Sequence, residues 1–277
     1  MRIAVLSGKG GTGKTFVSVN LSCAAAEAVY VDCDVEEPNG YLFLKPEIME
    51  RLPVTVTVPE VEPGKCTSCR KCVDFCKYNA LALIRDKLLI FHEVCHSCGG
   101  CMLFCPAKAI TEKEREIGAI AEGRSGNVTV LTGFLNTGEV SGVPVIKKLM
   151  NKLPRNGQIV IDCPPGSACI VMESIREADY CVLVAEPSLF GVHNLSMVYD
   201  LVRLFDKPFG VVLNKCLPEE NPAEGFCSGH QIRILGRIPY DAELGKLNSQ
   251  GHIAVRESKP YREFFCALLK RITGEAE

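Results

Sequence analysis

The chain has 277 residues, of which 31 are basic and 33 acidic, so its formal net charge is −2. This near balance excludes the strongly basic composition typical of nucleic-acid binding, and we expect no nucleic-acid partner. No apolar run approaches the ~20 residues that cross a bilayer, and the amino terminus does not resemble an export signal. We therefore expect a cytoplasmic protein. Sixteen cysteines in such a chain predict metal or redox chemistry, because disulfides are rare in the cytosol.

Short apolar runs alternate with helix-forming stretches along most of the chain. The predicted strands are 2–6, 29–34, 54–58, 127–133, 158–166, 180–186, 209–215 and 232–239, and the predicted helices are 14–27, 143–153, 193–205 and 259–272. Strands that alternate with helices form a mainly parallel sheet covered on both faces. The sequence therefore predicts an α/β fold.

Residues 59–113 break this pattern, because they are rich in proline, glycine and cysteine and contain one strand-like stretch, 87–91. We interpret them as a small α+β domain inserted into a surface connection of the sheet. Residues 1–58 and 114–277 then form one discontinuous domain around it.

The segment GKGGTGKT, residues 8–15, matches the phosphate-binding pattern G-x-x-x-x-G-K-[ST] between a predicted strand and a predicted helix. Its glycines let successive backbone N–H groups turn toward phosphate, and the helix N-terminus adds a positive field. Lys14 is expected to contact the β- and γ-phosphates, and Thr15 to bind Mg²⁺. The predicted nucleotide contacts in this segment are Gly8, Lys9, Gly10, Gly11, Thr12, Gly13, Lys14, Thr15 and Phe16.

Lys9 extends the motif to KGGTGKT, which resembles the deviant Walker A motif of the ATPases that include MinD, ParA, nitrogenase iron protein and Mrp-type iron–sulfur scaffolds. The resemblance implies a SIMIBI-type P-loop fold and a dimer, formed with a second copy or with a close relative. It also implies that Lys9 reaches across the dimer interface to the partner's nucleotide. Phe16 stands where this family more often has threonine or serine.

Two further segments are similar to the switches of this family: VDCDVEEPN (31–39) and IVIDCPPG (159–166). By this resemblance Asp34 orients the attacking water, so Lys9, Lys14 and Asp34 form the catalytic set. Asp32 and Asp162 support Mg²⁺ together with Thr15. The alternative interpretation of Asp32 and Asp34 is a pair of loop carboxylates, one of which caps a helix.

The end of the chain carries the expected base-binding residues. The segment LNK places Asn214 where the family contacts adenine, and GRIPYD, with Pro239, resembles the loop that packs on the base.

Two stretches of the insert repeat the spacing C-x₂-C-x₂-C-x₃-C, which is that of bacterial ferredoxins with [4Fe–4S] clusters. Such clusters take soft sulfur ligands, and the fourth cysteine of each run crosses to the other cluster. Zinc, the alternative, typically uses separated C-x₂-C pairs. The predicted ligands are Cys66, Cys69, Cys72 and Cys105 for cluster one, and Cys76, Cys95, Cys98 and Cys101 for cluster two.

Cys169 lies seven residues after Asp162. Nitrogenase iron protein is similar in having a cysteine near this point that binds a cluster bridging two subunits. We interpret Cys169 as a small switch residue and keep the bridging cluster as the alternative.

The whole chain resembles MinD-superfamily ATPases that carry an inserted ferredoxin domain. Three functions follow: an ATP-gated electron carrier, which we favour, an iron–sulfur assembly or carrier ATPase of Mrp type, and a positioning ATPase like MinD or ParA. The expected cofactors are ATP or ADP, Mg²⁺ and two [4Fe–4S] clusters. The expected partner is a redox or iron–sulfur client protein. A membrane partner is not expected, because the apolar stripe of helix 259–272 is predicted to pack on the sheet.

Overall fold

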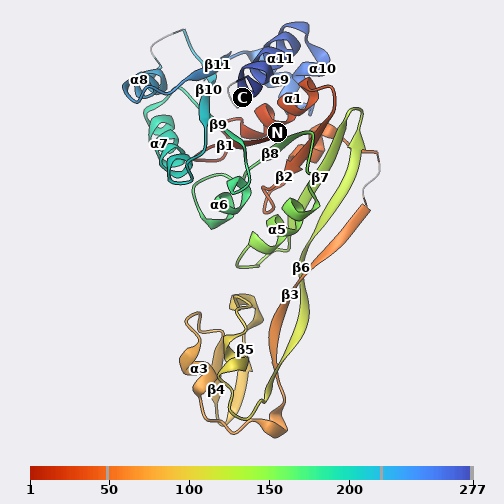
Figure 1. Cartoon of the computed structure of the whole chain (residues 1–277), viewed down its shortest axis with the longest axis vertical. Helices are drawn as coiled ribbons and strands as arrows, with labels where there is room; N and C mark the ends of the chain where they lie inside the picture. The colour runs from red at the N-terminus through yellow and green to blue at the C-terminus, as the bar shows by residue number, and fades with distance from the viewer. Residues whose placement is uncertain (48–49, 219–220, 275–277) are drawn as a thin grey trace.

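The computed structural model describes residues 1–47, 50–218 and 221–274. A nine-stranded sheet in the order β11-β10-β9-β1-β8-β2-β7-β6-β3 forms its body, and β4 and β5 form a separate hairpin (Figure 1). The strands are β1 (Arg2–Leu6), β2 (Ala28–Asp32), β3 (Glu50–Val61), β4 (Leu81–Ile84), β5 (Lys87–Ile90), β6 (Ile110–Ser125), β7 (Val128–Leu135), β8 (Gln158–Asp162), β9 (Tyr180–Ala185), β10 (Phe209–Cys216) and β11 (Ile234–Pro239). The helices are α1 (Lys14–Ala24), α2 (Gly40–Leu44), α3 (Lys71–Phe75), α4 (Gly100–Leu103), α5 (Val143–Lys152), α6 (Cys169–Ile175), α7 (Leu189–Leu204), α8 (Pro222–Gly229), α9 (Ala242–Ser249), α10 (Ala254–Glu257) and α11 (Lys259–Thr273), with 3-10 turns η1 (Pro63–Lys65) and η2 (His92–Val94).

The strands from β11 to β7 are parallel, and β6 and β3 are added antiparallel at one edge. The central strands read as continuous apolar runs because both of their faces are buried. In β1, Ala4 and Leu6 enter one core and Ile3 and Val5 the other. The predicted mainly parallel α/β fold is therefore confirmed.

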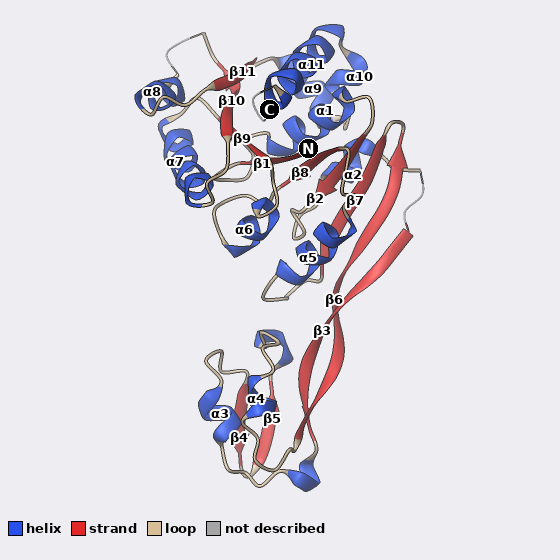
Figure 2. Cartoon of the chain, in the orientation of Figure 1, coloured by secondary structure: helices blue, strands red, loops and turns tan. Residues whose placement is uncertain are grey.

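Helices cover both faces of this sheet (Figure 2). The core on one face contains side chains of α5 to α8, and the core on the other face contains side chains of α1, α2 and α9 to α11. Phe265, Leu268 and Ile272 of α11 are buried, and the Phe265 ring meets the Phe16 ring edge-on with centroids 5.8 Å apart. The apolar stripe of the last helix thus packs on the body, as predicted. Within the described residues, no helix has the length and apolar character that spanning a membrane requires.

The strand β6 was missed by the sequence analysis, and β3 is longer than the predicted 54–58. The run TEKERE, residues 111–116, has no apolar alternation because the outer part of β6 pairs with β3 alone and exposes most of its side chains. Both strands continue without interruption through the expected domain boundaries at 58/59 and 113/114.

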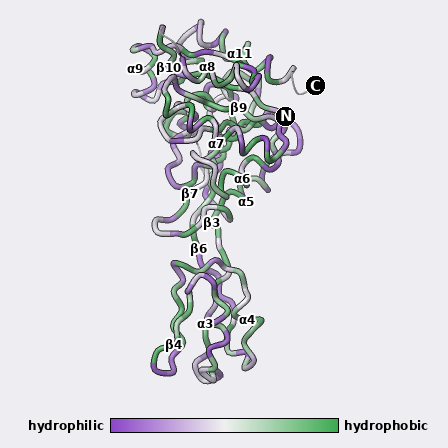
Figure 3. The backbone as a smooth tube through the Cα atoms, turned by 90° about the vertical axis from the view of Figure 1, so that its left-hand side faces the viewer, coloured by the Kyte–Doolittle hydropathy of each residue, from purple (hydrophilic) through white to green (hydrophobic). Residues whose placement is uncertain are grey.

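A bulge marks the point where this strand pair leaves the body. Val54 pairs with Gly118 and Thr55 with Glu116, so Ile117 is an extra residue of β6, and such a residue bends the strand. We call the outer parts of β3 and β6, beyond the bulge, the arm. The cysteine-rich lobe, residues 62–109, lies at the far end of the arm (Figure 3). The lobe has a small core of its own, formed by Cys72, Ala80, Leu81, Cys101 and Ile110.

Candidate functional site

The glycine loop between β1 and α1 borders a cavity of about 920 Å³. Gly13, just before α1, has a φ of 95°, and a Cβ at this position would lie 2.1 Å from Nδ2 of Asn214. Only glycine fits both constraints. Eight of the predicted nucleotide-binding, Mg²⁺-binding or catalytic residues line this cavity: Lys9, Gly10, Gly11, Gly13, Lys14, Thr15, Phe16 and Asp34.

The two remaining loop residues support its shape. Gly8 packs so closely on Asn194 of α7 that a Cβ would lie 2.1 Å from its carbonyl oxygen. Thr12 is buried, and its hydroxyl donates a hydrogen bond of 3.5 Å to the carbonyl of Lys9. Gly8 and Thr12 therefore help to fix the conformation of the loop through these contacts.

Lys14 meets the predicted acidic residues at the base of the cavity. Its Nζ lies 2.7 Å from Oδ1 of Asp162 and 3.6 Å from Oδ2 of Asp34. Asp32 and Asp162 are fully buried, and the backbone N–H of Gly40 donates to Asp32 at 2.9 Å. The structure thus brings together Lys14 and Asp34, both predicted to be catalytic, and both predicted Mg²⁺-supporting carboxylates.

Two side chains of this network were missed by the sequence analysis. The Tyr30 hydroxyl donates to Asp162 at 2.8 Å, and the Ser18 hydroxyl lies 3.1 Å from the same carboxylate. Ser18 stands one helical turn after Lys14, which is a signal that could have identified it. Tyr30 lies in an apolar strand, where nothing in the sequence separates it from a core residue.

The charges at this site are poorly balanced, because three carboxylates face one ammonium group. Burial disfavours the charged form of Lys14, but Asp162 and Asp34 outweigh that effect and hold the pKa of Lys14 above its ordinary value. Burial, reinforced by the charge of Asp162, raises the pKa of Asp32 to about 7. Burial likewise raises the pKa of Asp34 to about 6, although Lys14 opposes the shift. A bound cation would favour the ionised carboxylates.

Lys9 points away from this network toward the start of α7. Its ammonium forms an ion pair with Glu186 and lies 4.9 Å from the centroid of the Phe190 ring. Leu189 and Phe190 are 80% and 61% exposed, so an apolar surface borders Lys9. The structure therefore separates the two loop lysines, Lys14 facing inward and Lys9 toward the surface.

A second cavity of about 240 Å³ adjoins the first and contains the predicted base-binding residues. Asn214 and Pro239 line it, and Nδ2 of Asn214 donates to the carbonyl of Thr12 at 2.7 Å. Asn248 of α9, which the sequence analysis missed, lines both cavities. Its Oδ1 is buried without a hydrogen-bond partner among the described residues. The site thus offers an unused acceptor where a ligand amino group could bind.

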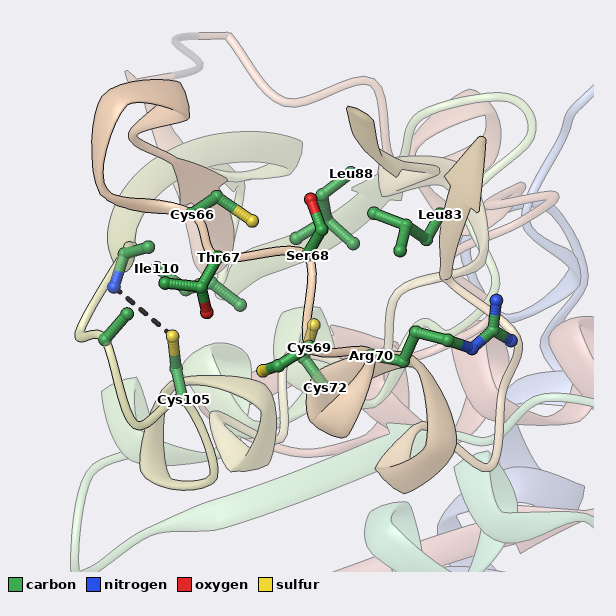
Figure 4. A pocket seen from close by; sticks show the side chains of 12 residues that line it. Cys66, Thr67, Ser68, Cys69, Arg70, Cys72, Leu83, Leu88, Cys105 and Ile110 are labelled. Carbon is green, nitrogen blue, oxygen red and sulfur yellow. Dashed lines mark hydrogen bonds between the residues drawn. The ribbon is translucent and has the colours of Figure 1, made fainter. Parts of the chain in front are cut away.

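The eight cysteines of the lobe form two groups. Cys66, Cys69, Cys72 and Cys105 line one cavity, and Cys76, Cys95, Cys98 and Cys101 line another. Each group takes three cysteines from one run and the last cysteine of the other, which is the division that the spacing predicts. Figure 4 shows the first group around its cavity.

The backbone of the two runs repeats as well. Positive φ angles occur at Ser68 and Ser97, at Arg70 and Gly99, and at Asn79 and Lys108, which are equivalent positions of the two runs. Such left-handed residues turn backbone N–H groups toward an anionic group. One such bond is present, from the N–H of Ala109 to Sγ of Cys105 at 3.3 Å.

The two groups differ in size. The first cavity measures about 20 Å³, and the second about 240 Å³. A cavity of the smaller size holds about one water molecule. Within the described ranges, no three His, Cys, Asp or Glu side chains are placed to hold a single metal ion.

Cys169 lies apart from both groups. It is exposed at the start of α6, close to the segment 159–166. The structure therefore leaves its thiol accessible on the body and away from the lobe.

Comparisons with known proteins agree with this fold. A family model for the CobQ/CobB/MinD/ParA nucleotide binding domain matches residues 3–255. An uncharacterized protein of Methanocaldococcus jannaschii is 32% identical over 257 residues, covering 91% of this chain and 90% of that protein. The septum site-determining protein MinD of Thermotoga maritima is 21% identical, covering 99% of this chain and 88% of that protein.

Solved structures show the same architecture. The cell division ATPase MinD of Pyrococcus furiosus superposes with a TM-score of 0.61 at 20% identity, covering 99% of this chain and 98% of that chain. MinD of Pyrococcus horikoshii OT3, complexed with Mg-ADP, superposes with a TM-score of 0.60 at 19% identity, covering 100% of this chain and 98% of that chain.

The raised pKa of Asp32 gives a prediction for stability without nucleotide or Mg²⁺. The ordinary pKa is 3.8 and the folded-state pKa about 7, so between these values the folded protein binds more protons than the unfolded chain. The free energy of unfolding should therefore fall as the pH rises through this range. Asp34, whose pKa is raised to about 6, contributes to the same fall, so Asp32→Asn should reduce it, most clearly above about pH 6, and thermal melts from about pH 5 to about pH 8 will show it. The exposed Asp200 provides the control Asp200→Asn, which should follow wild type. If the melting temperatures of Asp32→Asn and wild type change with pH in the same way, Asp32 ionises normally.

Proposed function

Because the chain belongs to the CobQ/CobB/MinD/ParA nucleotide-binding family, we propose that it hydrolyses ATP and that its nucleotide state controls electron transfer through two [4Fe–4S] clusters. The observation that carries this proposal is the grouping of eight cysteines into two sets of four, in the same chain as a complete phosphate loop. The phosphate loop supplies a switch, and the two cysteine sets supply ligands for redox centres.

The residues of the body suit a Mg²⁺-bound nucleotide. Thr15 lines the cavity and offers an oxygen ligand, which Mg²⁺ prefers. Asp32 and Asp162 are buried and would support Mg²⁺, whose charge would balance the excess of carboxylates. The loop N–H groups and Lys14 bind the phosphates. The unpaired acceptor of Asn248 and the adjoining cavity suit a base with an amino group, such as adenine. A MinD structure with this fold is itself complexed with Mg-ADP.

Hydrolysis follows from the placement of Asp34. Its carboxylate accepts a hydrogen bond from a water molecule, and takes up a proton of that water as the water oxygen attacks the γ-phosphorus and the bond from that phosphorus to the bridging oxygen of ADP breaks. Lys14 stabilises the charge that develops on the phosphate oxygens. ADP and phosphate are the products. Asp34 must be ionised for this role, which its pKa of about 6 permits at neutral pH.

A dimer completes the proposed site. Lys9 extends toward the surface beside the exposed side chains of Leu189 and Phe190. An exposed apolar patch next to a site is typical of an interface. We assign this face to a second copy or a close relative, which would receive Lys9 at its own nucleotide after the Glu186 ion pair opens.

The lobe suits iron–sulfur clusters by its donor chemistry. Each set provides four sulfur ligands, backed by apolar side chains such as Leu83, Leu88 and Ile110 around the first set. These side chains exclude water, and the N–H of Ala109 stabilises negative charge on Cys105. A bound [4Fe–4S] cluster accepts and donates single electrons. The client is then a redox or iron–sulfur protein that meets the lobe.

The end-to-end likeness to MinD favours a second candidate, a positioning ATPase in which the clusters are structural or sensory. ATP hydrolysis stimulated by lipid vesicles or DNA would support it. An Mrp-type carrier, the other alternative, requires a labile cluster beyond the eight cysteines of the lobe, and the exposed Cys169 is the residue that would bind it.

Replacing Asp34 tests the hydrolysis step. Asp34→Asn should lower kcat for ATP by about 10²–10⁴-fold, because the variant cannot accept the proton of the attacking water. Nucleotide affinity should remain close to that of wild type. In wild type, kcat/KM should fall as the pH drops through about 6, where Asp34 becomes protonated. The control is Glu27→Gln, a change at a carboxylate that is 76% exposed. Full hydrolysis by Asp34→Asn would remove Asp34 from the mechanism.

Iron and sulfide analysis of anaerobically purified protein tests the clusters. Wild type should contain about eight irons and about eight sulfides per chain, and Cys72→Ala about four fewer of each. Cys169→Ala should match wild type, and a loss of iron in that variant would favour the bridging cluster. Zinc without inorganic sulfide would contradict the electron-transfer function.

A further inference from the structure

The arm is tied to the body at its bulge. Because Ile117 is left out of the ladder with β3, its carbonyl oxygen is free to bond elsewhere. It accepts a hydrogen bond of 2.9 Å from the backbone N–H of Asn136. Asn136 begins the loop 136–142, which joins β7 to α5. The base of the arm therefore moves with this loop.

Arg115 connects the same loop to the lobe. Its guanidinium donates to both carboxylate oxygens of Glu139, at 2.6 and 2.7 Å. Glu139 is only 10% exposed, and a shielded bidentate pair fixes the orientation of both side chains. The guanidinium also donates to the carbonyl of His92 at 3.4 Å. His92 begins η2, the turn that leads directly into Cys95.

The ends of the loop touch the nucleotide site. The N–H of Leu135 donates to the carbonyl of Val35 at 2.8 Å, and Val35 follows Asp34 in the chain. A Cβ on Gly142 would lie 2.5 Å from Cγ2 of Val35, so the loop packs on this buried side chain with no spare room. A displacement of the segment 34–35 must therefore displace both ends of the loop.

The contact of Arg115 with Glu139 and His92, which we call the joint, also contains unsatisfied polar atoms. Nε of Arg115 and Nδ1 of His92 are buried and have no hydrogen-bond partner in the part of the chain that the structure describes. Such atoms are uncommon in folded proteins and unfavourable. A small rotation at this contact would therefore break no hydrogen bond of these two atoms.

We propose that Arg115 and Glu139 are positioning residues that transmit the nucleotide state of the body to the second cysteine group. This proposal rests on the function proposed above. A γ-phosphate repositions Asp34, as it does in switch loops generally. Val35 passes that movement to the loop 136–142, Glu139 passes it to Arg115, and Arg115 moves η2 and Cys95.

Hydrogen–deuterium exchange of the full chain, purified anaerobically, tests this connection. Exchange is measured without nucleotide, with Mg²⁺ and ADP, and with Mg²⁺ and a non-hydrolysable ATP analogue. In wild type, the analogue should change amide exchange in 135–142 and in 92–101. In Glu139→Gln, the change in 135–142 should remain and the change in 92–101 should be lost.

Two further variants complete the test. Glu60→Gln is the matched control, because Glu60 pairs with Lys113 on the same arm at 3.7 Å and is 58% exposed; it should respond as wild type does. Arg115→Lys keeps the charge but cannot bind both oxygens of Glu139 and also His92, so it too should lose the response in 92–101. Both joint variants should retain wild-type exchange in β1 and β8, which reports that the body is folded.

The outcomes separate this proposal from the function on which it rests. A full response of 92–101 in Glu139→Gln or in Arg115→Lys overturns the role of the joint. The role of the joint is also overturned if nucleotide protects residues 8–17 of wild type but leaves exchange in 92–101 unchanged. Nucleotide binding is still supported in that case. If no nucleotide protects 8–17, the proposed function fails together with the joint.

Discussion

The structure depends on one constraint of the parallel sheet: β1, β8 and β2 are neighbours, and their carboxyl ends meet at one edge. The glycine loop leaves β1, Asp162 ends β8 and Asp32 ends β2. Lys14 therefore reaches Asp162 over 2.7 Å, although the two residues are 148 positions apart in the chain. The charge imbalance at this edge follows from the same geometry, because the glycine loop and the carboxylates that end the neighbouring strands lie side by side.

The antiparallel edge of the sheet serves a different purpose. β6 and β3 extend the sheet beyond β7 and then leave it as an arm, so the cysteine-rich lobe is carried by two strands of the sheet itself. A flexible linker would let the lobe turn independently. Two paired strands with a bulge at Ile117 confine it, because bending of the arm disturbs the hydrogen bond to Asn136 and the ion pair with Glu139. The arm is therefore a continuation of the body's sheet, and its bending is coupled to contacts within the body.

Local patterns in the sequence were sufficient for the central sheet, the glycine loop and the division of the cysteines. A short motif such as GKGGTGKT, and a spacing such as C-x₂-C-x₂-C-x₃-C, set geometry within a few residues. The outer half of β6 could not be predicted, because the run TEKERE, residues 111–116, is polar throughout and has no apolar alternation. Asn248 and the pair of Arg115 with Glu139 were missed for another reason. Their roles arise from contacts between segments that are distant in the chain, and no periodicity records such contacts.

The central claim is that nucleotide bound at the body alters the redox centres of the lobe. The most direct measurement is an EPR-monitored redox titration of anaerobic wild-type protein with Mg²⁺ and ADP, and again with Mg²⁺ and a non-hydrolysable ATP analogue. The account predicts that the reduction potential or the spectrum of at least one cluster differs between the two nucleotides. Identical potentials and spectra, in protein that demonstrably binds both nucleotides, would contradict it.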